Sequence, residues 1–261
     1  MHTESTIIYG KNAVIEALQS GEREFNKILI SNNARADIKI EQIKKLAQKR
    51  GVVFQFVAKE KLNSLEPSGS HQGIIAQIAP VKYVDLGDYI EINKGNFAPV
   101  VILDGVEDSH NVGAIIRSCV CAGIKGIILP SRRGVLINST VEKTSAGATN
   151  HISIIKTNSL VNAIQKLKEN NYWVIASDHH SDQNYFDVDY TDMNFALIMG
   201  AEHSGISKSL LKLSDFRVKI PMLTNFNSLN VSNAAAIILF EAVKQRIKSQ
   251  GDQKCLKEMI L

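Results

Sequence analysis

The chain has 261 residues, of which 44% are hydrophobic and 21% charged, and it carries a formal net charge of +4. This composition is typical of a folded protein with two modest cores and excludes a disordered chain. Three cysteines without Cys-x-x-Cys spacing argue against a disulfide framework and a zinc site, which favours a reducing cytoplasm. The first nine residues contain no signal-peptide core, and no apolar run reaches the roughly 20 residues that span a bilayer, so no membrane partner is expected.

The first 80 residues alternate helical and extended patterns. They predict helices over 12–19 and 38–49, strands over 27–30, 52–57 and 73–78, and a short helix before the last strand. This alternation predicts a small α/β domain over residues 1–80. Residues 81–97 contain two glycines and several polar residues, and are interpreted as a linker with room for a short helix.

Residues 98–261 are predicted to form a second α/β domain. Apolar runs near Val100, Ile127, Ile152, Val174 and Leu197 are expected to be strands that alternate with helices. Alternation of this kind predicts a parallel sheet, and ligands of such sheets collect at the carboxyl ends of the strands.

The first candidate site segment follows the strand near Val100 and has the pattern Asn111-x-Gly113-Ala114-x-x-Arg117. A helix is expected to start near His110, so that Asn111 and Arg117 could face one crevice, with Arg117 as a phosphate clamp. The alternative for Arg117, taken alone, is a solvated helix arginine.

The second segment has the pattern Gly200-x-Glu202-x-x-Gly205 after the strand near Leu197. The two glycines permit positive φ and close approach by a ligand, and Glu202 could orient a cationic partner or fix a neighbouring loop. Taken alone, the segment is more naturally interpreted as an ordinary glycine-rich turn.

The third segment comprises Ile220-Pro221-Met222 and Ser228-Leu229-Asn230-Val231-Ser232, ahead of an apolar run over residues 234–240. Ser228 is expected to be the N-cap of the following helix, with Asn230 close to the positive helix end. The alternative is a capped core helix after a proline-containing turn.

Together, the three segments resemble the motifs of the SpoU/TrmH branch of the SPOUT methyltransferases in order and spacing. Residues 9–14 (Tyr-Gly-Lys-Asn-Ala-Val) and 71–74 (His-Gln-Gly-Ile) resemble the substrate-binding domain of its RlmB-like subgroup. The resemblance implies a C-terminal SPOUT domain with a parallel sheet and a deep trefoil knot, preceded by a small α/β, L30e-like RNA-binding domain. Knots are otherwise almost absent from proteins.

The resemblance also implies an activity: S-adenosyl-L-methionine-dependent 2′-O-methylation of a guanosine ribose in large-subunit ribosomal RNA. The implied catalytic residues are Arg117, Asn111, Glu202, Ser228 and Asn230, and the implied cofactor-binding residues are Gly200, Ile220 and Leu229. No metal is required. The resemblance further implies a homodimer through the knot region, with the helix over 234–246 as a candidate surface. A tRNA or other rRNA substrate, and a non-catalytic RNA-binding or ribosome assembly factor, remain alternatives.

Some features depart from the family pattern or lie outside it. Thr224 stands where many relatives carry glycine, which puts cofactor affinity in question because a β-branched residue resists positive φ. Arg132 and Arg133, and the basic segment Lys39, Lys44, Lys45, Lys49 and Arg50, are candidate contacts to RNA phosphates or merely solvated charges. Residues 177–182 (Ser-Asp-His-His-Ser-Asp) are interpreted as an exposed turn in preference to a metal site.

Overall fold

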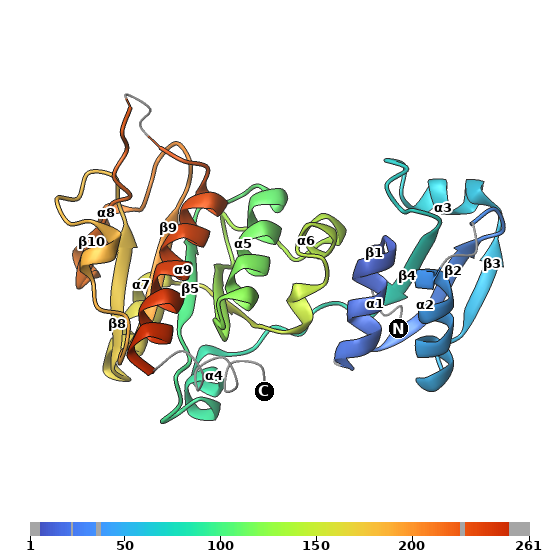
Figure 1. Cartoon of the computed structure of the whole chain (residues 1–261), viewed down its shortest axis with the longest axis horizontal. Coiled ribbons are helices and arrows are strands. Elements are labelled where there is room, and N and C mark those ends of the chain that lie inside the picture. The colour runs from blue at the N-terminus through green and yellow to red at the C-terminus, as the bar shows by residue number, and fades with distance from the viewer. Residues whose placement is uncertain (1–5, 22, 35–37, 225–227, 251–261) are drawn as a thin grey trace. The chain divides into compact units, whose positions relative to one another are not determined.

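The computed structural model describes residues 6–21, 23–34, 38–224 and 228–250, and its elements are labelled in Figure 1. The chain divides into two compact units. Unit 1 comprises residues 1–82 and 136–151, and unit 2 comprises residues 83–135 and 152–261. Cys255, one of the three cysteines, lies outside the described residues.

Unit 1 is built on a four-stranded mixed sheet. Its order is β1 (Thr6–Tyr9), β4 (Ile74–Ile78), β2 (Phe25–Ser31) and β3 (Phe54–Val57), with β4 antiparallel to both neighbours and β3 parallel to β2. Helices α1 (Lys11–Ser20) and α2 (Ile38–Lys49) pack on one face, while α3 (Lys59–Leu65) packs on the other. Alternate residues of β2 therefore enter different cores: Ile28 and Ile30 face α1 and α2, and Leu29 faces Leu62 of α3.

A second, distant stretch of sequence completes unit 1. It contains α6 (Ser139–Thr144) and the 3₁₀ turn η1 (Ala148–Asn150). Glu142 is 1% exposed and pairs with Arg23, which is 6% exposed, at 2.9 Å between Oε1 and Nη1. Arg23 also donates to the Ala79 carbonyl, and Glu142 accepts the Thr149 hydroxyl at Oε2. These partners compensate the buried charges of Arg23 and Glu142, and the ion pair links residues 136–151 to the rest of unit 1.

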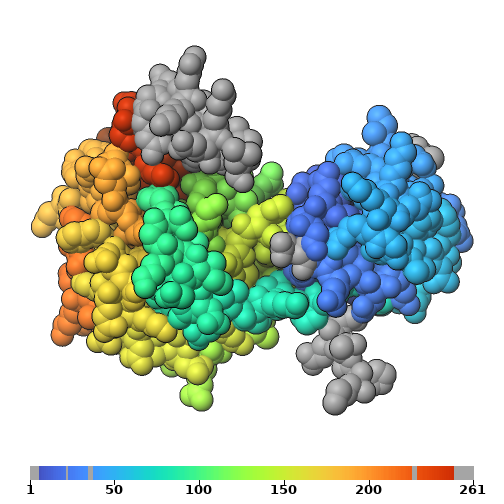
Figure 2. Space-filling model, turned by 90° about the horizontal axis from the view of Figure 1, so that it is seen from below, coloured from blue at the N-terminus to red at the C-terminus, as the bar shows by residue number. Residues whose placement is uncertain are grey.

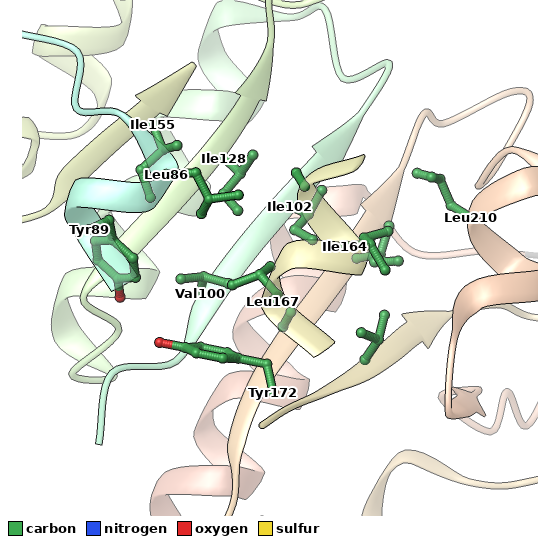
Figure 3. Packing of buried hydrophobic residues seen from close by; sticks show 14 of the residues in the cluster. Leu86, Tyr89, Val100, Ile102, Ile128, Ile155, Ile164, Leu167, Tyr172 and Leu210 are labelled. Carbon is green, nitrogen blue, oxygen red and sulfur yellow. The ribbon is translucent and has the colours of Figure 1, made fainter. Parts of the chain in front are cut away.

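Unit 2 is built on six parallel strands. In spatial order they are β10 (Phe216–Val218), β8 (Tyr172–Ser177), β9 (Asn194–Gly200), β5 (Val100–Asp104), β6 (Gly126–Pro130) and β7 (Ser153–Thr157). Helices α4 (Leu86–Ile92), α7 (Leu160–Glu169) and α8 (Lys208–Leu213) cover one core of this sheet, which Figure 3 shows from close by. Helix α4 belongs to residues 81–97, interpreted above as a linker, and it buries Tyr89 in that core.

Two further helices of unit 2 pack against each other. Helices α5 (Ser109–Cys121) and α9 (Val231–Gln250) lie side by side in Figure 1 and are in extensive contact. A 3₁₀ turn, η2 (Tyr185–Asp187), contacts α9. Of the helices in the described ranges, none combines the length and apolarity needed to cross a membrane.

The expected α/β class with a parallel sheet is confirmed. The five strands expected in the second domain form. Strands β1 and β10 were not predicted, because their four and three residues are too few to show an alternation of apolar and polar side chains. Helix α9 is also longer than expected, since it starts before residue 234 and continues beyond 246.

Candidate active site

A pocket of about 480 Å³ lies at the carboxyl ends of β8, β9 and β10. This volume falls in the range of about 300–1,000 Å³ typical of small-molecule and cofactor sites. Three strand ends form most of its walls: residues 177–180 at the end of β8, residues 199–206 at the end of β9, and Lys219, Ile220 and Met222 after β10. Helices complete the walls, with Leu211 of α8 and with Ser228, Leu229, Val231 and Ala234 around the start of α9. The pocket thus lies where open parallel sheets bind their ligands.

Three side chains from separate segments form a hydrogen-bonded group, here called the polar cluster: Asn111, Glu202 and Asn230. The Asn111 Nδ2 donates to Glu202 Oε1 at 2.9 Å. The Asn230 Nδ2 donates to Asn111 Oδ1 at 2.8 Å and to Glu202 Oε1 at 3.0 Å. Asn111 is buried, whereas Glu202 and Asn230 are exposed, so one end of the polar cluster lies in the protein interior and the other faces solvent.

Asn230 is held in one orientation by its second role, as the N-cap of α9. Its Oδ1 accepts the backbone N–H and the hydroxyl of Ser232, and the helix begins at Val231. The Nδ2 therefore has to point toward the polar cluster. The expectation that Ser228 caps this helix is wrong, because the helix starts three residues later, where Asn230 supplies the capping oxygen. Ser228 instead lines the pocket.

Gly200 is required by chain packing. A Cβ at this position would lie 2.3 Å from the carbonyl carbon of Gly205. The turn closes tightly because the backbones of Ala201 and Gly205 exchange two hydrogen bonds, and Gly205 has a φ of +64°. Asp104, at the end of β5, accepts the backbone N–H of Ser207 at 2.7 Å and fixes the far side of the turn. This packing positions Glu202, and the ligand role of Gly200 stays a prediction.

Arg117 is a predicted catalytic residue outside the polar cluster, and like Asn111 and Asn230 it does not line the pocket. It is exposed on α5. Asn111, from the same helix, reaches Glu202 and Asn230, whereas within the described residues no hydrogen bond joins Arg117 to them, and the expectation that Arg117 shares their site stays a prediction. Ile220 and Leu229, the other predicted cofactor residues, do line the pocket with Gly200.

The sequence interpretation missed several lining residues. His179 and His180 lie in the exposed turn expected over 177–182, but they also line the pocket, with ring centroids 3.8 Å apart. Their position directly after β8 could have identified them as lining residues, because the carboxyl ends of parallel strands lie at the same edge of the sheet. Within the described ranges, no group of three His, Cys, Asp or Glu is arranged to hold a metal ion.

Thr224 is not among the described residues with positive φ, so its backbone avoids the strain expected for a β-branched side chain.

Comparison with known proteins assigns both parts of the chain. Residues 98–240 match the SpoU rRNA methylase family, and residues 7–84 match the RNA 2′-O ribose methyltransferase substrate-binding family. A TrmH family tRNA/rRNA methyltransferase of Staphylococcus saprophyticus is 37% identical over 245 residues, which cover 93% of this chain and 97% of the relative. A relative of the same name from Staphylococcus aureus is also 37% identical.

Solved structures share the fold. An AdoMet-bound rRNA methyltransferase from Sinorhizobium meliloti superposes with a TM-score of 0.77 at 25% identity, covering 93% of this chain and 88% of that one. The SpoU methyltransferase AviRb from Streptomyces viridochromogenes gives a TM-score of 0.79 at 23% identity, covering 94% and 91%. From the two family matches and the near full-length relatives, the chain belongs to the SpoU/TrmH family of S-adenosylmethionine-dependent RNA 2′-O-methyltransferases.

Proposed function

We propose that this enzyme methylates the 2′-hydroxyl of a guanosine in large-subunit ribosomal RNA, in the cytoplasm. The RlmB-like motifs at residues 9–14 and 71–74 support this substrate, and both fall within the substrate-binding match over 7–84. The names of the relatives leave tRNA as the second candidate. In this proposal residues 1–80 bind RNA, 81–97 connect, and 98–261 catalyse.

The single observation that carries the catalytic part is the polar cluster beside the pocket. Gly200, Ile220 and Leu229 line the pocket and would hold S-adenosylmethionine, largely through backbone groups. When bound, the cofactor supplies an electrophilic methyl group. Transfer needs the 2′-oxygen in line with that methyl, and correct alignment can supply much of a rate enhancement. Glu202 and Asn230 expose fixed hydrogen-bonding groups beside the pocket, and Ser228 adds a hydroxyl, so these residues are assigned to alignment.

Arg117 is assigned to the RNA phosphate and to the alkoxide that develops on the ribose. A guanidinium does not ordinarily release its proton in a protein, so we assign positioning and charge stabilisation to Arg117 instead of proton removal. Because Arg117 is exposed outside the pocket of its own chain, we propose that the site is completed in a homodimer, by Arg117 of the partner subunit.

The proposed dimer surface lies on α9, in the region of the proposed trefoil knot. Helix α9 packs against α5, which carries Arg117. Ile237 and Phe240 of α9 leave 36% and 47% of their surface exposed, an apolar area that a second subunit can bury.

Methylation assays test the substrate. The protein is incubated with methyl-labelled S-adenosylmethionine and unmodified large-subunit rRNA or tRNA, and label is located by ribose-methylation mapping. Label at an rRNA guanosine, lost in Arg117→Ala, supports the proposal. Label on tRNA alone reassigns the substrate. Absence of label on either RNA contradicts catalysis on free RNA and favours a pre-ribosomal particle or a non-catalytic assembly factor.

Mixing two inactive variants tests the shared site. In a heterodimer of Arg117→Ala and Glu202→Ala, one of the two sites combines an intact Glu202 with the partner's Arg117. After random subunit exchange, activity should return to roughly a quarter of wild type if the symmetric site is shared. If each site uses its own chain's Arg117, both sites of the heterodimer are defective and mixing restores nothing. A monomer at working concentration also contradicts the proposal.

A further inference from the structure

Unit 1 carries a surface that the proposed catalytic site does not use, formed by α2 and the edge strand β3. Phe56 of β3 is 51% exposed, and its ring meets that of Phe54 edge to face, with centroids 6.3 Å apart. The Lys44 ammonium lies 5.5 Å from the centroid of the Phe56 ring. An exposed aromatic ring with a cation at its face is therefore present on the part of the chain that matches an RNA substrate-binding family.

The exposure of Phe56 follows from its position in the sheet. Phe54 and Phe56 share one face of β3, and Phe54 packs against the core under α1 and α2. Phe56 lies two residues further along a strand whose one neighbour in the sheet is β2, and Lys44 covers part of it. Ile38 of α2 and Val53, which directly precedes β3, are also largely exposed. Figure 2 shows, in light blue, the surface that the segment from α2 to α3 contributes to unit 1.

The cations of this segment divide into two groups. Arg50 is committed to structure, because its guanidinium donates to the carbonyls of Ala17, Leu18, Gly21 and Arg23 and lies over the Phe25 ring. The interpretation of Arg50 as a phosphate contact therefore finds no support. Lys45 and Lys49, by contrast, are exposed and one helical turn apart. Glu41 is the acidic residue of α2, and it pairs with Lys44 at 2.8 Å.

We propose that Phe56, Lys44, Lys45 and Lys49 form a docking platform for a single-stranded segment of the RNA substrate. An unpaired base stacks on the Phe56 ring, and the Lys44 ammonium moves from the ring to the phosphate that accompanies the base. Lys45 and Lys49 bind the next phosphates along α2. The chemistry matches that of proteins that bind single strands, which combine aromatic stacking with a basic track and tolerate different bases. This inference rests on the proposed function for the identity of the RNA.

The platform predicts a distinct kinetic signature. Its residues lie in unit 1 and the pocket residues lie in unit 2, so the platform contributes to RNA binding and leaves the methyl-transfer geometry unchanged. Loss of the platform raises KM for RNA at unchanged kcat, and weakens binding less when the target segment is base-paired. Replacing Lys45 and Lys49 lowers the dependence of binding on salt, since fewer counterions are released.

The test measures RNA affinity of the full-length protein without cofactor, by fluorescence anisotropy on unmodified large-subunit rRNA fragments. Because one stacked base contributes about 5- to 160-fold in affinity, Phe56→Leu should weaken binding by a factor in that range, and Phe56→Trp should retain the affinity of wild type. Phe186→Leu is the matched control, because Phe186 is 45% exposed on unit 2 and should bind RNA as wild type does.

Equal affinity of wild type, Phe56→Leu and the double variant Lys45→Ala/Lys49→Ala would overturn the platform, as would failure of the wild type to bind RNA. The outcome is separable from the proposed function. If Phe56→Leu weakens binding but the wild type transfers no methyl group, the platform stands and the proposed catalysis falls. If Arg117→Ala abolishes methylation while Phe56→Leu leaves affinity and KM unchanged, the catalysis stands and the platform falls.

Discussion

Each unit contains a polar group of side chains built around one glutamate, and the two differ in burial. In unit 1 the buried Glu142 uses both oxygens, one with the Arg23 guanidinium and one with the Thr149 hydroxyl. In unit 2 the exposed Glu202 receives two amide donors on one oxygen, from Asn111 and Asn230. The first group neutralises its charge internally, whereas no ion pair joins Glu202 to a cation within the described ranges.

This difference separates a structural network from a candidate functional one. A buried carboxylate that loses its partner remains desolvated, so the cost falls on folding. An exposed carboxylate held by neutral amides faces solvent, and mutation there changes what the pocket can position. Similar residue types thus serve stability in unit 1 and, in our proposal, catalysis in unit 2.

Removing the cation of the buried group should have the largest effect on stability. Arg23→Ala leaves Glu142 buried without its ion pair, and we expect the free energy of unfolding of unit 1 to fall by about 3–5 kcal/mol. Hydrogen exchange resolved by peptide should show faster exchange in unit 1 and little change in the β5–β9 core of unit 2. Lys44→Ala, which removes an exposed ion pair, is the control. Unchanged protection in Arg23→Ala would show that the ion pair does not hold unit 1.

Removing the carboxylate of the polar cluster should act on activity instead. Glu202→Ala withdraws the acceptor shared by Asn111 and Asn230, and a misplaced alignment group costs on the order of 10²-fold in kcat. The melting temperature should stay close to that of wild type because Glu202 is exposed. Glu202→Gln keeps the shape and tests the charge separately. Full activity in Glu202→Ala would remove Glu202 from the proposed site.

The sequence predicted elements and motifs well wherever one segment carried the signal. Helix α2 has the expected bounds, and the segments that follow β5 and β9 contribute Asn111, in the first turn of α5, and Glu202. Choices between neighbouring polar residues were not predictable: Ser228 and Asn230 are both good N-caps, and the tertiary contacts of Asn230 decide between them. The pairing of Arg23 with Glu142 could not be predicted from the sequence either, since 119 residues separate them and neither residue lies in a recognisable sequence motif.

A third group of polar side chains is buried but neutral, and its removal should have the smallest effect on stability. In Figure 3 the hydroxyl groups of Tyr89 and Tyr172 point toward one another, and both donate to the Ala98 carbonyl, at 3.0 and 2.9 Å. Burial raises the pKa of both phenols, which keeps them protonated donors at neutral pH.

Tyr172→Phe should therefore cost only about 1 kcal/mol of unfolding free energy in unit 2, because Tyr89 still satisfies the carbonyl. The double variant Tyr89→Phe/Tyr172→Phe leaves that buried acceptor without either hydroxyl, so its cost should exceed the sum of the two single costs in urea denaturation. Strictly additive costs would show that the two donors act independently. Since Tyr172→Phe leaves no buried charge without a partner, its loss of unfolding free energy should be far smaller than that of Arg23→Ala. Such a result would attribute the difference between the two buried groups to the desolvated charge of Glu142.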